Sequence, residues 1–330
     1  MNLSFDQIRA AARGVVRVTE ENGVFRFYRF TEAQSAAYLA VGRRDFYEKS
    51  FASAGVRLAF FSNTEHLSFS FKPYSGSSRK WFSFDVCANG RIVAHGEYDR
   101  ENDPATFRMD AALPAGEKKV EVYLPFSARV DLSDVAVDDG ATFAPAPRAH
   151  TMIEFGDSIT HGYDAHYPSL SYANRLAAML DADPVNKGIG GDVFFPALLD
   201  GADACDAPDY VTVAYGTNDW SHRDPVETET AIRDFFRKLS ARYPAAKIFA
   251  IGPIWRGDGE KTTTPFHAPV RVMESKIRER VADLPNVTVI PGEYLVPHSP
   301  DFFIPDCLHP NDFGFCLYAA NLYEEIKKHL

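Results

Sequence analysis

The sequence predicts a two-domain protein, in which a β-sandwich of the jelly-roll type precedes an α/β domain built on a parallel sheet. Hydrophobic and polar residues alternate with a period of two in short segments of the first half, whereas apolar strands and amphipathic helices follow one another after residue 150. The segment between these patterns, DDGATFAPAPRAH, is rich in glycine and proline, as is typical of a linker. We therefore place the sandwich at residues 1–147 and the α/β domain at residues 148–330.

In the first half, strands are predicted where alternating segments lie between turn residues. The predicted strands are residues 56–61, 66–72, 81–87, 91–98 and 118–124. Asn89 and Gly90 lie between the third and the fourth of these strands, and this pair favours a tight hairpin turn. Helices are predicted only at residues 5–12 and 31–40. Many short strands with regular turns are typical of a jelly-roll-like sandwich.

In the second half, short apolar strands are separated by longer amphipathic helices. The predicted strands are residues 151–155, 184–186, 210–215, 247–251 and 287–290. The predicted helices are residues 172–180, 227–242, 270–282 and 315–330. The helix at 227–242 places Ile232, Phe235, Phe236 and Leu239 on one face. Because a helix lies between successive strands, we expect the strands to pair in parallel and helices to cover the sheet.

The composition excludes several classes of protein. The net charge of −10 disfavours nucleic acid and anionic membranes as partners. No apolar run approaches the roughly 20 residues that span a bilayer, and the N-terminus has no signal-peptide pattern, so we expect a cytoplasmic protein. The cysteines, which form no CxxC pair and are expected to be small core residues, are Cys87, Cys205, Cys307 and Cys316.

The stretch GDSITHG, residues 156–162, follows the first predicted strand of the second half and contains a candidate nucleophile, Ser158. Ligands bind at the carboxyl edge of such sheets, although a serine there can also cap a helix. Asp306 and His309 lie three residues apart before the last helix. At that spacing the carboxylate can reach His309 Nδ1 while Nε2 faces a serine, as a nucleophile and its base require.

Donors for a developing oxyanion are available at the ends of the next two strands. Gly191 follows the second strand, and a glycine there lets a backbone N–H approach a substrate closely. Asn218 follows the third strand and offers a side-chain amide. GIGG is also part of a dinucleotide-binding pattern, but Val193 stands where its last glycine should be. GTND alone could be an ordinary turn.

Together, GDSIT, GIGGD, GTND and DCLHPN resemble the blocks of the SGNH hydrolase superfamily, also called GDSL esterases, in their usual order from Met152 to the C-terminus. The resemblance implies a flavodoxin-like three-layer α/β/α fold. It also implies Ser158 as nucleophile and His309 as base. The oxyanion donors would be the Ser158 and Gly191 N–H groups and the Asn218 amide. Neither a metal nor another cofactor is implied.

Other polar and aromatic residues lie on the loops around this predicted site. His161, Asp164 and His166 could suggest a metal, but a fourth ligand at useful spacing is missing, so we expect a polar rim of the pocket. The residues predicted to bind the substrate are Tyr163, Trp220 and Trp255. Either tryptophan could instead pack against neighbouring loops.

A jelly-roll ahead of an SGNH domain resembles two-domain carbohydrate esterases and a smaller group of acyltransferases that act on natural products. We therefore predict a serine esterase for small O-acyl esters, above all acetyl esters, of a carbohydrate. The alternatives are an acyltransferase that uses the same residues on a small-molecule acceptor, a non-catalytic carbohydrate-binding protein, and a long-chain lipase. Tyr74 and Trp81 of the first half could bind sugar, although we expect Trp81 in the sandwich core.

Overall fold

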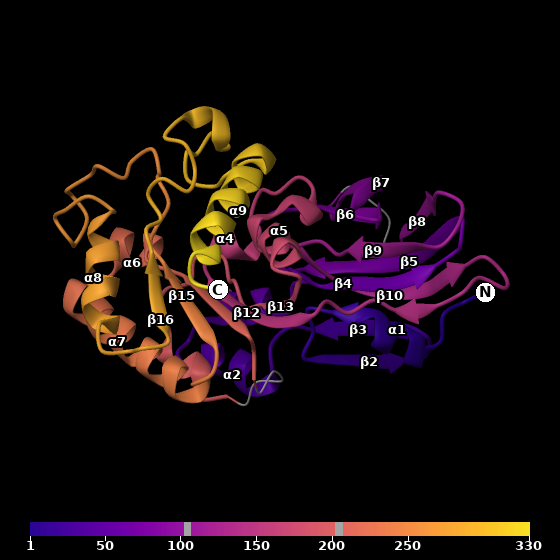
Figure 1. Cartoon of the computed structure of the whole chain (residues 1–330), viewed down its shortest axis with the longest axis horizontal. Helices are drawn as coiled ribbons and strands as arrows, with labels where there is room; N and C mark the ends of the chain where they lie inside the picture. Colours follow the sequence, from indigo (N-terminus) through magenta and orange to yellow (C-terminus); the bar gives the residue numbers. More distant parts are fainter. Residues whose placement is uncertain (102–106, 202–206) are drawn as a thin grey trace.

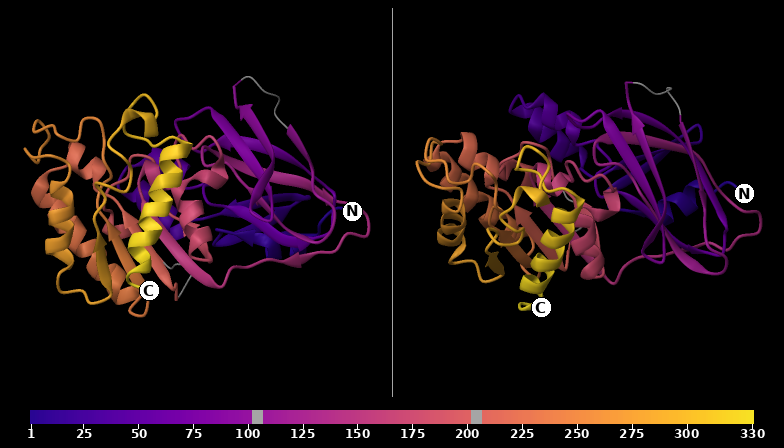
Figure 2. Two further views of the ribbon diagram at one scale, coloured as in Figure 1. Left: turned by 45° about the horizontal axis from the view of Figure 1, so that its top comes forward. Right: turned by 90° about the horizontal axis from the view of Figure 1, so that it is seen from above.

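The computed structural model describes residues 1–101, 107–201 and 207–330. An antiparallel β-sandwich and an α/β unit with a parallel sheet lie side by side along the longest axis of the molecule (Figures 1 and 2). The predicted fold class is confirmed. We keep the division at residues 147 and 148 as our proposal for the domain boundary, because antiparallel pairing ends at β11 (Ala144–Pro145) and parallel pairing begins at β12 (His150–Gly156).

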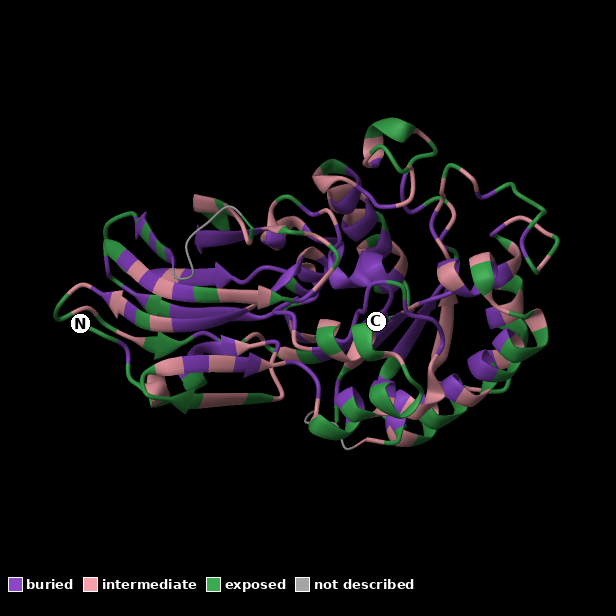
Figure 3. Cartoon of the chain, turned by 180° about the vertical axis from the view of Figure 1, so that it is seen from behind, coloured by how far each residue is buried: buried purple, intermediate pink, exposed green. Residues whose placement is uncertain are grey.

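Two antiparallel sheets form the sandwich. Besides β11, the strands of the sandwich are β1 (Ala12–Arg13), β2 (Arg17–Glu21), β3 (Val24–Tyr28), β4 (Arg57–Ser62), β5 (His66–Ser75), β6 (Trp81–Ala88), β7 (Arg91–Asp99), β8 (Phe107–Ala112), β9 (Lys118–Tyr123) and β10 (Ala128–Val137). One sheet has the order β1-β4-β9-β6-β7, with β11 beside β4, and the other has the order β2-β3-β10-β5-β8. Burial alternates along β3, β5 and β8, whereas β6 is buried along most of its length, and Figure 3 shows the strands coloured by burial.

The sandwich core is rich in phenylalanine. Phe71 lies 4.5 Å from Phe84 and 5.2 Å from Phe107, measured between ring centroids. Aromatic pairs at these distances contribute beyond the area that they bury. The predicted strands in this half are all present, and they share this core with residues of helix α1 (Phe5–Ala11), β3, β8 and β10.

Asn-Gly turns close two hairpins of the sandwich, of which the sequence predicts one. Asn89 and Gly90 have φ values of 49° and 76°, which confirms the tight turn between β6 and β7. Asn22 and Gly23 form the same kind of turn, with φ values of 53° and 77°, between the unpredicted strands β2 and β3. β10 was missed because a bulge at Asp134 (φ 49°) interrupts its alternation.

The α/β unit has the parallel order β13-β12-β14-β15-β16. The strands after β12 are β13 (Ala182–Asn186), β14 (Tyr210–Ala214), β15 (Lys247–Ile251) and β16 (Val287–Ile290). In chain order this is 2-1-3-4-5, the flavodoxin-like arrangement. It places the loops after β12, β13 and β14 at one carboxyl edge, where such sheets bind ligands.

Helices cover both faces of the parallel sheet. They are α4 (Ser158–His161), α5 (Tyr172–Met179), α6 (Thr217–His222), α7 (Pro225–Arg242), α8 (Val272–Val281) and α9 (Asp312–Lys327). Short 3-10 turns are η1 (Pro168–Leu170), η2 (Pro196–Leu199) and η3 (Pro300–Phe302). Helices α5 and α9 share one apolar cluster with the sheet, and α7 and α8 share the other. None of the described helices combines the length and apolar character needed to cross a bilayer.

The first half also contains helices α1 (Phe5–Ala11), α2 (Glu32–Ala40) and α3 (Arg44–Lys49). The helices predicted at 5–12 and 31–40 are confirmed, and α2 begins with a capping box between Thr31 and Gln34. Helix α3 was not predicted. Figure 1 shows α2, in indigo, beside the α/β unit rather than on the sandwich, and it contacts η2 there.

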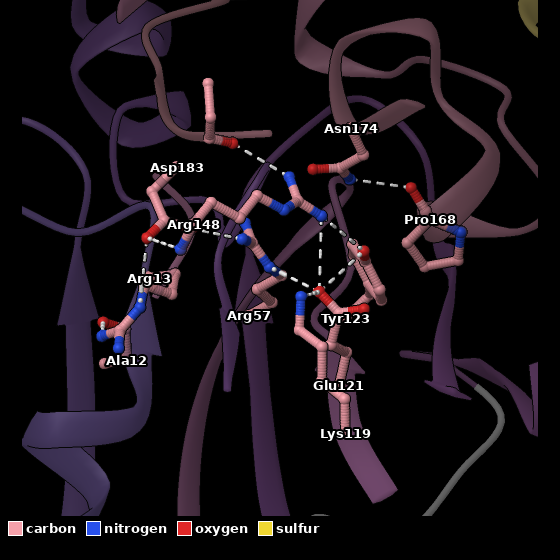
Figure 4. Close-up of polar contacts among 11 residues, drawn as sticks. Ala12, Arg13, Arg57, Lys119, Glu121, Tyr123, Arg148, Pro168, Asn174 and Asp183 are labelled. Atoms are coloured by element: carbon pink, nitrogen blue, oxygen red, sulfur yellow. Dashed lines mark hydrogen bonds and ion pairs between the residues drawn. The ribbon is translucent and has the colours of Figure 1, made fainter. Parts of the chain in front are cut away.

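A buried cluster of charges joins the two halves (Figure 4). The Arg57 side chain on β4 is fully buried, and its guanidinium nitrogens lie 2.5 Å from an Asp183 oxygen on β13 and 3.2 Å from a Glu121 oxygen on β9. Arg148 Nη2 lies 3.3 Å from the same Glu121 oxygen, and Nη1 donates to the Ala182 carbonyl. Because buried charges are costly unless paired, this cluster fixes β4 and β9 against β13.

The described cysteines are free. Cys87 is buried, as predicted, whereas Cys307 and Cys316 are partly buried. Cys205 lies outside the described residues.

Candidate active site

The turn after β12 presents Ser158 at the carboxyl edge of the parallel sheet. A Cβ on Gly156 would overlap the Thr160 side chain, so this position needs glycine. Asp157 is the N-cap of α4, and its Oδ1 accepts from the Ile159 N–H at 2.9 Å. Burial raises the pKa of Asp157 to about 7. Since Asp157 caps the helix, the Ser158 hydroxyl is left for other partners.

Ser158, His309 and Asp306 form a chain of hydrogen bonds. His309 Nε2 lies 2.8 Å from Ser158 Oγ, and Nδ1 lies 2.6 Å from an Asp306 oxygen. The other Asp306 oxygen accepts from the Leu308 and His309 backbone N–H groups. Burial raises the pKa of Asp306, but these hydrogen bonds outweigh it and lower the pKa to about 2. An ionised carboxylate only accepts, so Nδ1 carries the proton and Nε2 can accept one from Ser158.

A second carboxylate lies behind His309. An Asp164 oxygen is 3.7 Å from His309 Nδ1. Arg79, on the loop between β5 and β6, donates to both Asp164 oxygens at 2.7 and 2.6 Å. The Tyr163 ring stacks on the His309 ring at 5.8 Å between centroids, and the Arg79 guanidinium lies over Tyr163. The sandwich therefore braces the imidazole through Arg79, which the sequence analysis did not single out.

Gly191, a predicted oxyanion donor, lies on a tight loop at residues 188–192. Gly191 has a φ of 90°, and no described residue accepts a hydrogen bond from its N–H. Asn218 Nδ2 donates to the Asp192 carbonyl at 2.9 Å, which holds the amide beside this loop. A Cβ on residue 191 would lie 3.5 Å from the Phe46 ring of α3. Phe46 therefore borders the candidate site, although nothing in its sequence pattern pointed there.

Residues of the first half hold the same loop from the outside. Lys49 Nζ donates to the Gly190 carbonyl at 2.8 Å, and Arg29 Nη1 donates to the Gly188 carbonyl at 2.8 Å. The Tyr38 hydroxyl donates to an Asp192 oxygen at 2.7 Å. Burial raises the pKa of Asp192 to about 7. Helices α2 and α3 thus position the loop that carries Gly191.

His161 lies in the site, but not at the expected rim. It is buried, its Nε2 lies 3.0 Å from the Phe126 carbonyl oxygen, and its Nδ1 accepts from the Gly190 N–H at 3.1 Å. Burial holds the pKa of His161 well below its usual value, which fits a neutral ring that accepts through Nδ1. Both nitrogens are engaged, so His161 helps to fix the loop at residues 188–192.

The predicted substrate-binding residues occupy different positions. Trp220 is only 1% exposed and its indole N–H donates to the Ala268 carbonyl, so in this structure it packs between loops. Tyr163 is buried against His309. Trp255 is half-buried and stacks on His298 at 5.8 Å between centroids. Trp81, expected in the core, instead lies edge-on to Phe126 and lines a groove on the sandwich.

A model of the GDSL-like lipase/acylhydrolase family matches residues 155–315. This range contains every residue of the hydrogen-bonded chain and both predicted oxyanion loops. No curated protein matches the chain.

Among solved structures, a salicylyl-acyltransferase from a tetracycline biosynthetic pathway is similar to this chain, with a TM-score of 0.77 and 19% identity over 96% of this chain and 94% of that one. A family two carbohydrate esterase from Clostridium thermocellum, in complex with cellohexaose, has a TM-score of 0.65 and 18% identity over 84% and 93%. An acetyl xylan esterase from the rumen bacterium Butyrivibrio proteoclasticus has a TM-score of 0.60 and 16% identity over 84% and 91%. At these identities the likeness shows a shared fold.

Proposed function

We propose that the protein is a serine esterase that hydrolyses small O-acyl esters, above all acetyl esters, of a carbohydrate, because residues 155–315 match a model of the GDSL-like lipase/acylhydrolase family. The observation that carries the proposal is the hydrogen-bonded chain from Ser158 through His309 to Asp306. Those residues stand at the carboxyl edge of the sheet, where an ester can approach the hydroxyl.

In this mechanism Ser158 Oγ attacks the ester carbonyl while His309 Nε2 takes its proton. Asp306 stabilises the imidazolium and keeps the proton on Nδ1. The Ser158 and Gly191 N–H groups and the Asn218 amide receive the oxyanion. His309 then protonates the leaving alcohol. Water then attacks the acyl-enzyme while His309 Nε2 takes its proton. His309 returns that proton to Ser158 Oγ as the acid leaves.

A small cavity lies next to the turn that carries Ser158. It has a volume of about 20 Å³, and its lining includes Asp157 and Ile159, which flank Ser158 in the chain, together with Thr217 and Leu308. Ser158, Gly191, Asn218 and His309 do not line this cavity, so the preference for a short acyl group rests on the fold shared with an acetyl xylan esterase. The carbohydrate part of the proposal is supported by the fold shared with carbohydrate esterases.

An acyltransferase is the second candidate. The salicylyl-acyltransferase aligns with 96% of this chain, whereas the two carbohydrate esterases each align with 84%. The same residues would form the acyl-enzyme, and an acceptor alcohol would replace water in the second half of the reaction. Exclusion of water from the site decides between the two outcomes.

Initial rates on p-nitrophenyl esters from acetate to octanoate test the proposal. We expect the highest kcat/KM on acetate, a steep fall with chain length, and a loss of about 10⁴-fold or more in Ser158→Ala. Ser133→Ala, on β10 of the sandwich, is the matched control and should be fully active. Rates that rise with chain length would indicate a lipase, and release that persists in Ser158→Ala would exclude Ser158 as nucleophile.

A competing alcohol separates the two candidates. With an acetylated monosaccharide as donor and a second sugar as acceptor, a hydrolase yields acetate as its main product. A transferase yields the acylated acceptor, and in a separate assay its release of p-nitrophenol from p-nitrophenyl acetate accelerates when the acceptor is added.

A further inference from the structure

We propose that His95, Glu97 and His166 form a binding site for a divalent cation of the Zn²⁺ type, at the junction of the sandwich and the α/β unit. The site is separate from the hydrogen-bonded chain at Ser158. His95 and Glu97 lie two positions apart on β7, so both side chains point to the same face of the strand. His166 comes from the loop between α4 and η1 of the other half.

The distances among the donor atoms suit one small ion. All three donor atoms lie within 4.8 Å of one another. His95 Nε2 is 3.4 Å from Glu97 Oε1, and His166 Nε2 is 2.5 Å from the same oxygen. Two ligands of a tetrahedral Zn²⁺ lie about 3.3 Å apart, given metal–ligand bonds of about 2.0 to 2.1 Å. The first pair already has this spacing. The second needs a shift of under about 1 Å by that measure, in two exposed side chains.

His95 is oriented as a metal ligand would be. Its Nδ1 lies 2.7 Å from an oxygen of the fully buried Asp85, so Nδ1 carries the proton and the lone pair of Nε2 points toward Glu97 and His166. His95 Nε2 is buried and has no hydrogen-bond partner among the described residues. A carboxylate behind a histidine ligand fixes its ring and tautomer in many zinc sites. Here that arrangement leaves the lone pair of a buried nitrogen facing a carboxylate without a hydrogen-bond donor.

The His166 side of the site is held by both halves of the molecule. The Ser83 hydroxyl on β6 donates to the His166 carbonyl at 2.7 Å. The other Asp85 oxygen accepts from the Ser169 N–H at 2.8 Å, so one buried carboxylate orients His95 and anchors the segment after His166. Glu97 and His166 also line an open groove of about 490 Å³, which gives an ion a path from solvent.

The donor set selects the class of cation. Two imidazoles and one carboxylate suit Zn²⁺, Co²⁺ or Ni²⁺, whereas Mg²⁺ and Ca²⁺ prefer oxygen ligands alone. Zn²⁺ would tie β7 to the loop that carries His166 and, two residues earlier, Asp164. An ion that binds only the folded protein stabilises it.

The test is calorimetric titration of ZnCl₂ into tag-free protein that has been treated with a chelator and dialysed. We expect one Zn²⁺ per chain and a rise in the thermal unfolding midpoint when Zn²⁺ is present. Co²⁺ should give visible absorption bands of a tetrahedral site. Excess Mg²⁺ should not displace Zn²⁺.

Variants assign the ion to these residues. His95→Ala and Glu97→Gln should each weaken Zn²⁺ binding by at least about tenfold, as loss of a ligand or its support does. His66→Ala is the matched control, because His66 is an exposed strand histidine beside a single carboxylate, Asp138, and it should bind as the parent does.

The proposal fails if the parent protein shows no saturable Zn²⁺ binding, or if folded Glu97→Gln and His166→Ala both bind Zn²⁺ as tightly as the parent. Glu97 and His166 are about half exposed, so their replacement should leave the fold intact, which circular dichroism checks.

Discussion

Arg79 and Asp164 form a two-pronged ion pair, with guanidinium nitrogens 2.7 and 2.6 Å from the two carboxylate oxygens. One partner belongs to the sandwich and the other lies behind the imidazole of His309. Because Arg79 binds both Asp164 oxygens, Asp164 stays 3.7 Å from His309 Nδ1. Asp306 lies 2.6 Å from the same nitrogen and is its closer partner.

Arg79→Ala should therefore lower kcat on p-nitrophenyl acetate by about tenfold, because the released carboxylate competes for His309 Nδ1. Arg108→Ala is the control, since Arg108 pairs with Asp110 on the sandwich surface. Arg79→Lys should recover only part of the rate, because an ammonium cannot donate to both oxygens in the same geometry. Equal rates in the Arg79 and Arg108 variants would show that the ion pair has no influence on His309.

Asp306→Asn and Asp164→Asn should separate the roles of the two carboxylates. An amide at residue 306 favours the wrong imidazole tautomer, so kcat should fall by more than about 100-fold. Asp164→Asn should cost less than about tenfold, because its oxygen is 3.7 Å from His309 Nδ1. Single-turnover rates and KM for both variants provide the check. The reverse order of severity would assign the orienting role to Asp164.

Gly191→Ala should lose activity beyond what its loss of stability explains. A φ of 90° strains any residue with a Cβ, at a cost of about 1 to 3 kcal/mol. Gly116, with a φ of 84° and open space around it, is the control for this strain alone. Chemical denaturation should show similar losses of stability in both alanine variants. Only Gly191→Ala should also slow acyl transfer, because its methyl group enters the space between the loop and Phe46.

Glu154→Gln should stabilise the protein at neutral and alkaline pH. Glu154 lies within β12, neither carboxylate oxygen has a hydrogen-bond partner among the described residues, and burial raises its pKa from 4.5 to about 8. Between these two values the folded state holds a proton that the unfolded state releases, so the free energy of unfolding falls as pH rises.

The gain from Glu154→Gln should be small near pH 4.5 and grow to a few kcal/mol near pH 8, since one pKa unit corresponds to about 1.4 kcal/mol. Urea unfolding at several pH values measures it. A gain that does not change with pH would mean that the carboxyl group titrates normally.

Sequence patterns are informative where the relevant physics is local. The spacing of Asp306 and His309 predicted their hydrogen bond, because a turn of four residues sets that distance. The glycine before Asp157 and the alternation along β6 and β7 likewise depend on neighbours in the chain.

Local sequence patterns do not predict contacts between segments that are far apart in the chain. Arg79 and Phe46 reach the site because the sandwich packs against the α/β unit, and neither lies in a motif. Trp220 follows the GTND block, yet it is enclosed by a loop far along the chain. His166 was grouped with its neighbours in sequence, whereas its side chain meets β7 of the other half.

The enclosed guanidinium of Arg57 has a consequence for protein engineering. Its charge is balanced from both halves, by Glu121 and by Asp183, and removal of one member of such a buried group costs about 3 to 5 kcal/mol. The sandwich therefore cannot be exchanged for that of another protein without regard to this cluster. A chimera that takes its N-terminal half from another protein would need residues equivalent to Arg57 and Glu121 that match Asp183 on β13. Otherwise a buried charge at the interface between the halves would lack its partner.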